Sequence, residues 1–445
     1  MRVPRYKAVV DTLAADIRSG RRPAGARLPT QRALAAREGI ALVTASRVYT
    51  ELGAMGLVSS EQGRGTFVRE TALPPGHGID QAAVPVDTRD LSFNYPSVDG
   101  QTELLRQALR DLATAGDLEA LLRYQPHAGR PHDRAAVAYH LAHRGLHLGP
   151  DQTLIVNGAQ HGLAVTAMAT LSSGDVVAVD ALTYPGFKVL AAALGLDLVA
   201  LPVTDTGPDL DALNQVCARR PVRAIYTMPT LHNPLGWVTD LAARERLVAI
   251  ARHHGLLIIE DASYAFLAEN PPPPIAALAP ETTIYVSGLS KNVATGLRVG
   301  FLAAPPPRVP AIERAIRATT WNTPALTTAI ACRWIEDGTV ERLEAEKRHD
   351  ARTRQTLARD ALTGLRTISH PSSYFIWLPL PEDTRADLIA ASLARAQVAV
   401  STADPFATST HVPQALRLAL GSINLTDLTA TLADVRQAVD DEIYR

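Results

Sequence analysis

The sequence predicts an α/β body preceded by a small helical domain, and three features indicate this arrangement. From about residue 150, short β-branched runs such as TLIVNG and DVVAVD alternate with helix-like segments. Because these runs are apolar on both faces, they are typical of a mostly parallel sheet covered by helices. The first seventy residues instead show helical periodicity followed by two short strand-like runs. A stretch rich in Pro, Gly and Ala separates the two regions, so we expect separate domains.

The two regions differ in charge, although the composition as a whole is that of a globular protein. Hydrophobic residues make up 47% of the 445 residues and charged residues 20%. Residues 1–70 hold 12 Lys and Arg against 6 Asp and Glu, whereas the other 375 residues hold 32 against 39. A basic segment attached to an acidic body indicates a polyanionic partner for that segment alone.

The sequence also argues against several classes of protein. It contains no run of about 18 apolar residues that could cross a membrane, and its N-terminus lacks the pattern of a signal peptide. Two cysteines, Cys217 and Cys332, form no CxxC motif, which suits a reducing cytoplasm. We expect no metal site, because no carboxylate-rich pattern accompanies the histidines at positions 127, 132, 140, 143 and 147.

The N-terminal segment is predicted to form a helix-turn-helix followed by a β-hairpin. Apolar residues repeat at helical spacing over residues 6–19, and Thr30 and Gly39 are suitable N-cap and C-cap residues for a second helix. IALVTASRVYTELGAMG then predicts a third helix after a tight turn. In a helix-turn-helix of this kind, the second helix lies in the major groove of DNA. LVSSEQGRGTFV predicts the two short strands of a wing.

The motifs LPTQRALA, TASRVYTEL and GRGTFV make this segment more specific, because together they resemble the winged-helix domain of the GntR family of bacterial repressors. The resemblance covers about residues 5–69. It implies that DNA is contacted by Arg32, Thr44, Ser46, Arg47, Arg64 and Gly65. One departure is Ala41-Leu42, where the family usually has Ser-Arg. The loss of this arginine implies a different operator or weaker binding.

In the body, polar residues follow predicted strands at the points where these strands end. NGAQHG opens a helix after the first strand, and such a turn presents free N–H groups to an anion. Asn233, Asp261 and Lys291 each follow a later strand, with spacings of 28 and 30 residues. Since the carboxyl ends of parallel strands share one edge, these side chains are expected to converge.

A lysine, an aspartate, an asparagine and a phosphate-binding turn are the groups that pyridoxal 5′-phosphate requires. This combination resembles the fold-type I aminotransferase family over about residues 90–440, and the whole chain resembles the MocR subfamily of GntR regulators. The resemblance implies a winged helix at 1–70, a linker at 71–90 and an aminotransferase-like domain at 91–445. It divides the latter into a large subdomain at about 91–320 and a smaller C-terminal α/β subdomain at about 321–445.

Each site residue receives a role from this resemblance. Lys291 would hold the cofactor as a Schiff base, Asp261 would face the pyridine nitrogen, and Arg417 would bind a substrate or effector carboxylate. The other cofactor contacts implied are Asn233 and Tyr264 at the phenolic oxygen, Tyr184 on the ring, and Ala159, Gln160, Ser287, Ser290 and Arg298 at the phosphate, with Tyr124 reaching the phosphate of a neighbouring subunit. Gly288 departs from the Thr or Ser usual in the family, which leaves the division of phosphate contacts between Ser287 and Ser290 open.

These expectations define a cytoplasmic transcription regulator whose aminotransferase-like domain senses pyridoxal phosphate or an amino compound. The resemblance also implies a homodimer with domain-swapped DNA-binding domains. Two alternatives stay open at this point: an active aminotransferase that carries a DNA-binding domain, and an inert dimerisation scaffold. Taken singly, each residue also has a structural explanation, such as a solvated lysine or a helix-capping aspartate. The joint occurrence of these residues at successive strand ends favours the cofactor site.

Overall fold

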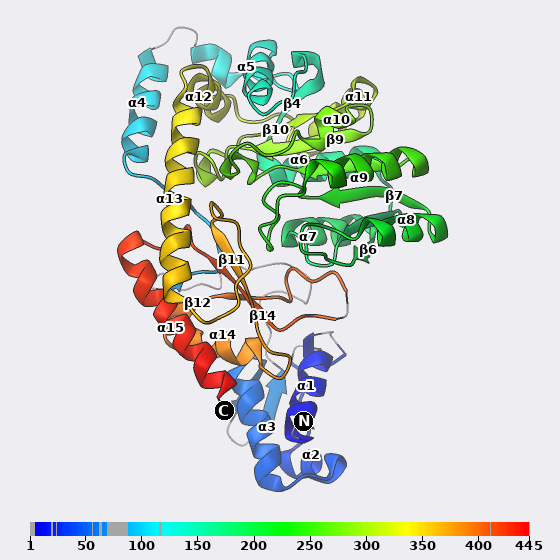
Figure 1. Cartoon of the computed structure of the whole chain (residues 1–445), viewed down its shortest axis with the longest axis vertical. Helices are drawn as coiled ribbons and strands as arrows, with labels where there is room; N and C mark the ends of the chain where they lie inside the picture. Colours follow the sequence, from blue (N-terminus) through cyan, green and yellow to red (C-terminus); the bar gives the residue numbers. More distant parts are fainter. Residues whose placement is uncertain are drawn as a thin grey trace.

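The computed structural model describes residues 5–18, 21–23, 25–55, 57–61, 65–68, 88–114, 118–409 and 411–444. The chain consists of an N-terminal domain (residues 5–68) and a body of two subdomains joined by one long helix, α13 (Figure 1). The predicted wing residue Arg64 lies outside the described residues, as does the predicted linker except for residues 88–90.

The N-terminal domain has the predicted helices and hairpin. Its elements are α1 (Arg5–Arg18), α2 (Gln31–Glu38), α3 (Leu42–Ala54), β1 (Val58–Glu61) and β2 (Gly65–Val68), and the two strands pair antiparallel. The Thr30 side chain accepts a hydrogen bond from the Ala33 N–H at the start of α2, and Gly39 ends this helix in the left-handed conformation with φ of 62°. Both predicted caps are therefore confirmed. Apolar residues spaced by helical turns form the core, among them Val10, Leu13, Leu34, Val48 and Leu52.

The large subdomain is built on a seven-stranded sheet of order β4-β10-β9-β8-β7-β5-β6. The strands are β4 (Thr153–Val156), β5 (Val176–Asp180), β6 (Asp197–Leu201), β7 (Val222–Thr227), β8 (Leu257–Asp261), β9 (Thr283–Gly288) and β10 (Gly300–Ala303). Strands β5 to β9 pair in parallel, whereas β10 lies antiparallel between β4 and β9. The prediction of a mostly parallel sheet is confirmed.

Helices cover this sheet, which explains why its strands are apolar on both faces (Figure 1). The helices of this subdomain are α4 (Gln101–Thr114), α5 (Pro131–Ala142), α6 (Gly158–Thr170), α7 (Pro185–Leu194), α8 (Leu210–Arg219), α9 (Leu241–His254), α10 (Ile275–Leu278), α11 (Val309–Thr319) and α12 (Ala325–Glu336). Adjacent residues of a strand point to opposite faces of the sheet and pack in different cores: Ile259 of β8 belongs to one hydrophobic core and Ile258 to another. Both side chains are fully buried, and each such burial stabilises the fold by about 1.5–3 kcal/mol.

Helix α13 (Thr339–Ala361) runs from the large subdomain into the small one, which carries the C-terminus (Figure 1). The small subdomain contains an antiparallel sheet of order β11-β14-β13 and two further helices. Its elements are β11 (Phe375–Pro379), β13 (Ser401–Thr402), β14 (Ala415–Ala419), α14 (Ala386–Arg395) and α15 (Leu425–Ile443). The expected smaller C-terminal α/β subdomain is confirmed. Strand β3 (Arg89–Asp90) pairs in parallel with β12 (Val398–Ala399), so the chain enters the body at this subdomain.

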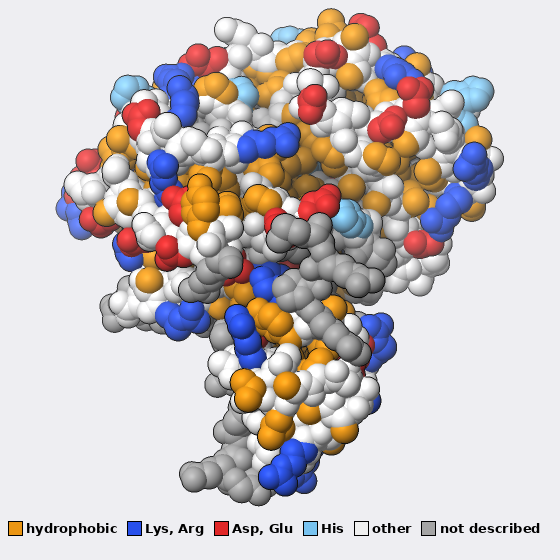
Figure 2. Space-filling view, turned by 60° about the horizontal axis from the view of Figure 1, so that its bottom comes forward, with side chains coloured by type: hydrophobic (Ala, Val, Ile, Leu, Met, Phe, Trp, Pro, Cys, Tyr) orange, Lys and Arg blue, Asp and Glu red, His pale blue; other side chains and the backbone are white. Residues whose placement is uncertain are grey.

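The N-terminal domain packs against the small subdomain and projects from the body as a separate lobe, with Lys and Arg side chains near its outer end (Figure 2). Asp11 of α1 forms an ion pair with Arg385, which directly precedes α14. The Arg385 guanidinium also donates to Asp387 at 2.7 Å and lies 3.7 Å from the Met55 sulfur. Within the described ranges, no helix is both long and apolar enough to span a membrane.

Candidate cofactor and DNA-binding sites

A cavity of about 660 Å³ lies at the carboxyl ends of the strands, where the large subdomain faces the small one. Such edges are where α/β sheets usually bind ligands. The cavity brings together these residues from the sequence prediction: Ala159, Gln160, Tyr184, Asn233, Asp261, Tyr264, Ser290, Lys291, Arg298 and Arg417. The segment Ser92–Tyr95, which we call the arm, also lines the cavity, together with Val189 and Phe406.

Lys291 lies in the turn that follows β9, with its ammonium group at the cavity wall. Its Nζ atom donates to the carbonyl oxygen of Asn94 at 2.9 Å. The rings of Tyr95 and Tyr264 flank this atom, with centroids at 6.0 and 5.9 Å. The lysine amine is thus held at the meeting point of the arm and the large subdomain.

Asp261 ends β8, is buried and lines the cavity. It accepts hydrogen bonds from the Tyr226 hydroxyl at 2.9 Å, the Ser263 hydroxyl at 2.6 Å and the Ser263 N–H at 3.0 Å. Burial raises the pKa of the Asp261 carboxyl, while the bonds from Ser263 and Tyr226 oppose this shift. A buried carboxylate of this kind is well suited to a cationic N–H partner.

The turn before α6 forms a cradle suited to an anion. The first N–H groups of α6 have no partners within the helix, and the Asn157 side chain does not cap them. Arg298 reaches over this turn, where its two terminal nitrogens donate to the Asn157 carbonyl and the Ser290 hydroxyl, each at 3.2 Å. A Cβ atom at Gly158 would lie 2.6 Å from the Arg298 guanidinium, and φ there is +77°. A Cβ atom here would displace the guanidinium from the turn, and the positive φ also favours glycine.

Two further predicted residues, Tyr184 and Asn233, also line the cavity. Tyr184 precedes α7, and burial raises the pKa of its hydroxyl. Asn233 is buried, and its side-chain oxygen has no hydrogen-bond partner among the described residues. The preceding His232 is also buried, with Nε2 at 3.2 Å from a carboxylate oxygen of Asp180. An unpaired buried amide oxygen is costly unless a ligand satisfies it.

Arg417 occupies the middle of β14 on the small-subdomain side of the cavity. It is buried, and burial lowers the pKa of its guanidinium. One terminal nitrogen donates to the Ser92 carbonyl at 2.8 Å, and the rings of Phe375 and Phe406 lie 5.7 and 5.5 Å from the guanidinium carbon. The Nε atom is buried and has no partner within the described part of the chain.

Two predicted residues do not line this cavity. Ser287 is buried on β9, where its hydroxyl donates to the Ala262 carbonyl at 3.3 Å. Tyr124 is 83% exposed and lies against Trp321, with ring centroids 5.6 Å apart. Its predicted contact with a neighbouring subunit involves a second chain and stays a prediction.

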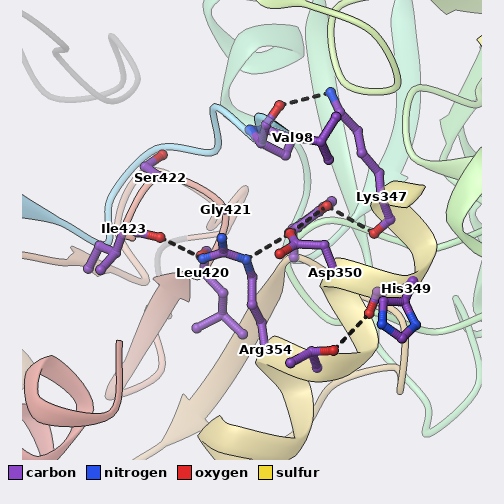
Figure 3. A network of polar contacts seen from close by, with 12 residues as sticks. Val98, Lys347, His349, Asp350, Arg354, Leu420, Gly421, Ser422 and Ile423 are labelled. Atoms are coloured by element: carbon purple, nitrogen blue, oxygen red, sulfur yellow. Dashed lines mark hydrogen bonds and ion pairs between the residues drawn. The ribbon is translucent and has the colours of Figure 1, made fainter. Parts of the chain in front are cut away.

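Sequence reasoning missed a hydrogen-bonded network on α13 that supports the cavity (Figure 3). Lys347 is 0% exposed, and its Nζ atom donates to the carbonyl oxygens of Pro96, Val293 and Lys291 at 2.8, 2.6 and 3.1 Å. About two helical turns further along, Arg354 donates to the Leu420 and Ile423 carbonyls at 2.7 and 2.6 Å. A lysine on a helix rich in charged residues usually indicates a solvated position, so the sequence offered no signal for this burial.

The predicted DNA-contacting residues lie on the exposed side of the N-terminal domain. Arg32 and Arg47 are exposed, while Thr44 and Ser46 are half-buried at the start of α3. The Arg47 guanidinium lies 4.5 Å from the Tyr6 ring centroid and 3.5 Å from a Glu51 oxygen. Val43 is 81% exposed beside Leu42, so apolar side chains stand where the family usually has an arginine. Apolar contacts of this kind suit thymine methyl groups. Gly65 begins β2 with φ of +120°.

Comparison with known proteins identifies both parts of the chain. Residues 87–432 match the family of class I and II aminotransferases, and residues 5–68 match the gntR family of bacterial regulatory proteins. The uncharacterized HTH-type transcriptional regulator YdeF of Bacillus subtilis (strain 168) is 28% identical over 98% of this chain and 95% of its own length. The probable rhizopine catabolism regulatory protein MocR of Rhizobium meliloti is 28% identical over 76% of this chain and 72% of its own.

The body also has a close structural counterpart. The crystal structure of LysN, the α-aminoadipate aminotransferase of Thermus thermophilus, complexed with N-(5′-phosphopyridoxyl)-L-leucine, superposes with a TM-score of 0.74. It is 26% identical and covers 80% of this chain and 93% of its own. Together with the winged helix and the regulator relatives, this likeness shows that the chain belongs to the MocR-type GntR transcriptional regulators, in which an aminotransferase class I and II domain follows the DNA-binding domain.

Proposed function

We propose that this regulator binds pyridoxal 5′-phosphate in the cavity and uses it to sense an amino compound. The observation that carries the proposal is the convergence of Lys291, Asp261 and the α6 cradle on one cavity of about 660 Å³. These groups match the cofactor: the Lys291 amine suits its aldehyde, the buried Asp261 carboxylate suits its ring nitrogen, and the anion cradle suits its phosphate. The orphaned side-chain oxygen of Asn233 adds support, because a bound ligand would supply its missing partner.

In this proposal the predicted side chains that line the cavity keep the roles expected from the sequence. Lys291 would hold the aldehyde carbon, Asp261 would accept from the ring nitrogen, and Arg298 with Ser290 would bind the phosphate. Tyr184, Asn233 and Tyr264 would contact the ring and its phenolic oxygen. When bound, pyridoxal phosphate supplies an electrophilic carbon that exchanges amines and a ring that accepts electrons. The phosphopyridoxyl-leucine in the related LysN structure is consistent with a site of this kind.

We infer that the response reaches DNA through the small subdomain. Arg417 lies on β14 of this subdomain, and the Asp11–Arg385 ion pair attaches the N-terminal domain to it. A ligand that binds one arrangement of the small subdomain better than another would shift the population of N-terminal domain positions. The proposal includes a cytoplasmic homodimer whose two DNA-binding domains match two operator half-sites, with exchanged domains as the expected arrangement.

An active aminotransferase is the second candidate, favoured by the presence of Asn233, Asp261 and Arg417 in one cavity. A titration of the cofactor-loaded protein with amino acids and amines, each with a keto-acid acceptor, separates the two. A visible spectral shift without sustained keto-acid formation supports a sensor. Sustained turnover supports the enzyme, and a protein that binds no cofactor contradicts both proposals and leaves a dimerisation scaffold.

A further inference from the structure

The first turn of α3 in the N-terminal domain carries two exposed apolar side chains. Leu42 and Val43, which we call the apolar tip, are 47% and 81% exposed. Among the described residues of this domain, no other large apolar side chain is exposed, and most of them pack in one core. A single exposed apolar residue is ordinary on a protein surface, but an adjacent pair at this position calls for an explanation.

The packing of α3 determines where the apolar tip points. Ala45, Val48 and Leu52 on the inner face of this helix are fully buried in the domain core. The Tyr49 hydroxyl donates to the Pro29 carbonyl at 2.5 Å, which holds α3 against the segment before α2. The exposed side chains of the first turn therefore project outward from a fixed helix.

The apolar tip lies at the end of α3 that is remote from the body. Met55 follows the other end of the helix, and its sulfur lies 3.7 Å from the Arg385 guanidinium of the small subdomain. The rise from Val43 to Met55 along the helix is about 18 Å. Contact with the body therefore leaves the tip uncovered.

The charge of the surrounding surface favours DNA as the molecule that covers the tip. Arg32 on α2 and Arg47 on α3 are exposed, and Lys and Arg side chains lie beside apolar ones near the outer end of this lobe (Figure 2). Residues 1–70 hold 12 Lys and Arg against 6 Asp and Glu. A basic surface attracts a polyanion. In a helix-turn-helix, the first residues of the second helix meet base edges in the major groove.

The chemistry of the tip restricts which base it can recognise. Leucine and valine side chains have no hydrogen-bond donor or acceptor. In the major groove, thymine presents a C5 methyl group, whereas the edges of adenine, guanine and cytosine present donors and acceptors. An apolar side chain gains free energy by covering a methyl group and loses it by covering an unpaired polar edge. Both effects favour thymine opposite the tip.

We propose that the apolar tip recognises thymine in the operator, with Val43, flanked by Leu42, packed against the C5 methyl group of the base. This inference goes beyond the proposed sensing function, because it concerns the reading of DNA and does not depend on cofactor binding.

The test begins with the selection of operator sequences from random duplex DNA by the full-length protein, with and without pyridoxal phosphate. Each thymine of a selected operator is then replaced singly by uracil, which lacks only the C5 methyl group. Fluorescence anisotropy gives the Kd for each duplex. At one thymine or at two adjacent thymines, uracil should weaken wild-type binding about three- to tenfold, the loss expected for one buried methyl group.

Variants of the tip then show whether these residues contact that methyl group. Val43→Ala should weaken binding to the thymine operator, and the further loss caused by uracil should fall below about twofold. This non-additivity distinguishes a direct contact from a general loss of affinity. Val203→Ala is a matched control, since it makes the same change at a position of the body that is 38% exposed, and it should alter neither quantity.

The inference is overturned if no thymine of the selected operator shows a uracil penalty above about twofold for the wild type. It is also overturned if this penalty persists in both Val43→Ala and Leu42→Ala. A changed oligomeric state with an unchanged penalty would make the tip an interface with a second chain, which overturns the inference as well. The cofactor titration tests the sensing function separately, so failure of one proposal is distinguishable from failure of the other.

Discussion

The Nζ atom of Lys347 lies 3.1 Å from the carbonyl oxygen of Lys291, so a buried ammonium on α13 holds the backbone of the lysine at the centre of the cavity. The same ammonium holds the arm through Pro96 and the Lys291 turn through Val293. Further along α13, Arg354 holds the loop that follows β14 (Figure 3). One helix therefore connects Lys291, the arm and the small-subdomain strand that carries Arg417.

Lys347→Met should destabilise the protein by about 2–4 kcal/mol at neutral pH, because it leaves buried carbonyl oxygens without a donor. Chemical denaturation of the wild type and the variant measures this difference.

The pH dependence of this difference provides a second test. Burial, and then the charge of Lys291, lower the pKa of Lys347 from 10.5 to about 7, although Asp350 and Glu344 oppose the shift. Between these values the unfolded chain binds more protons than the folded one, so the stability that Lys347 contributes rises as pH increases from about 7 toward 10.5. The stability difference between wild type and Lys347→Met should therefore widen over this range. A constant difference would show that the folded state keeps this lysine charged.

Lys291→Ala should abolish covalent attachment of pyridoxal phosphate, because it removes the amine that borders the cavity. Borohydride reduction followed by mass analysis measures attachment, and Lys7→Ala in the N-terminal domain is the control. Retention of a covalently bound, visible-absorbing cofactor by Lys291→Ala would contradict the central assignment.

Gly158→Ala should weaken cofactor binding by about tenfold or more, because its Cβ atom would lie 2.6 Å from the Arg298 guanidinium that covers the cradle. Gly174→Ala is a matched control, since this glycine also has positive φ, +87°, but nothing within 4 Å of the new Cβ atom. Fluorescence titration with pyridoxal phosphate compares the two. If both variants lost cofactor affinity to a similar extent, backbone strain and not the contact with Arg298 would explain the effect.

Arg385→Gln should loosen the attachment of the N-terminal domain, because the ion pair with Asp11 joins α1 to the small subdomain. Amide hydrogen exchange in α1 should become roughly two- to fivefold faster, the range expected for a partly exposed ion pair. Arg395→Gln makes the same charge change at an exposed position on α14, the helix that follows Arg385, and should leave exchange in α1 unaltered. Unaltered exchange in Arg385→Gln as well would show that this ion pair does not hold the domain.

If the exposed Arg47 contacts a phosphate, Arg47→Ala should weaken binding to operator DNA. It should also reduce the slope of log affinity against log salt concentration by about one. Fluorescence anisotropy at several salt concentrations measures both quantities. Arg436→Ala, on α15 of the body, removes an equally charged side chain far along the chain and should leave the slope unchanged. If Arg47→Ala kept the wild-type salt dependence, Arg47 would not contact a DNA phosphate.

The sequence by itself determined what local chemistry controls. Helix periodicity and the caps at Thr30 and Gly39 predicted the winged-helix elements, because caps act within one helical turn. Strand ends predicted the meeting of Asp261 and Lys291, because parallel strands deliver their carboxyl ends to one edge. The tertiary structure alone decided the antiparallel insertion of β10, the burial of Lys347 and the placement of Asn94 beside Gly421. Asn94 and Gly421 are 327 positions apart, and no local preference encodes a contact over that distance. Only the packing of the two subdomains around α13 brings such residues together.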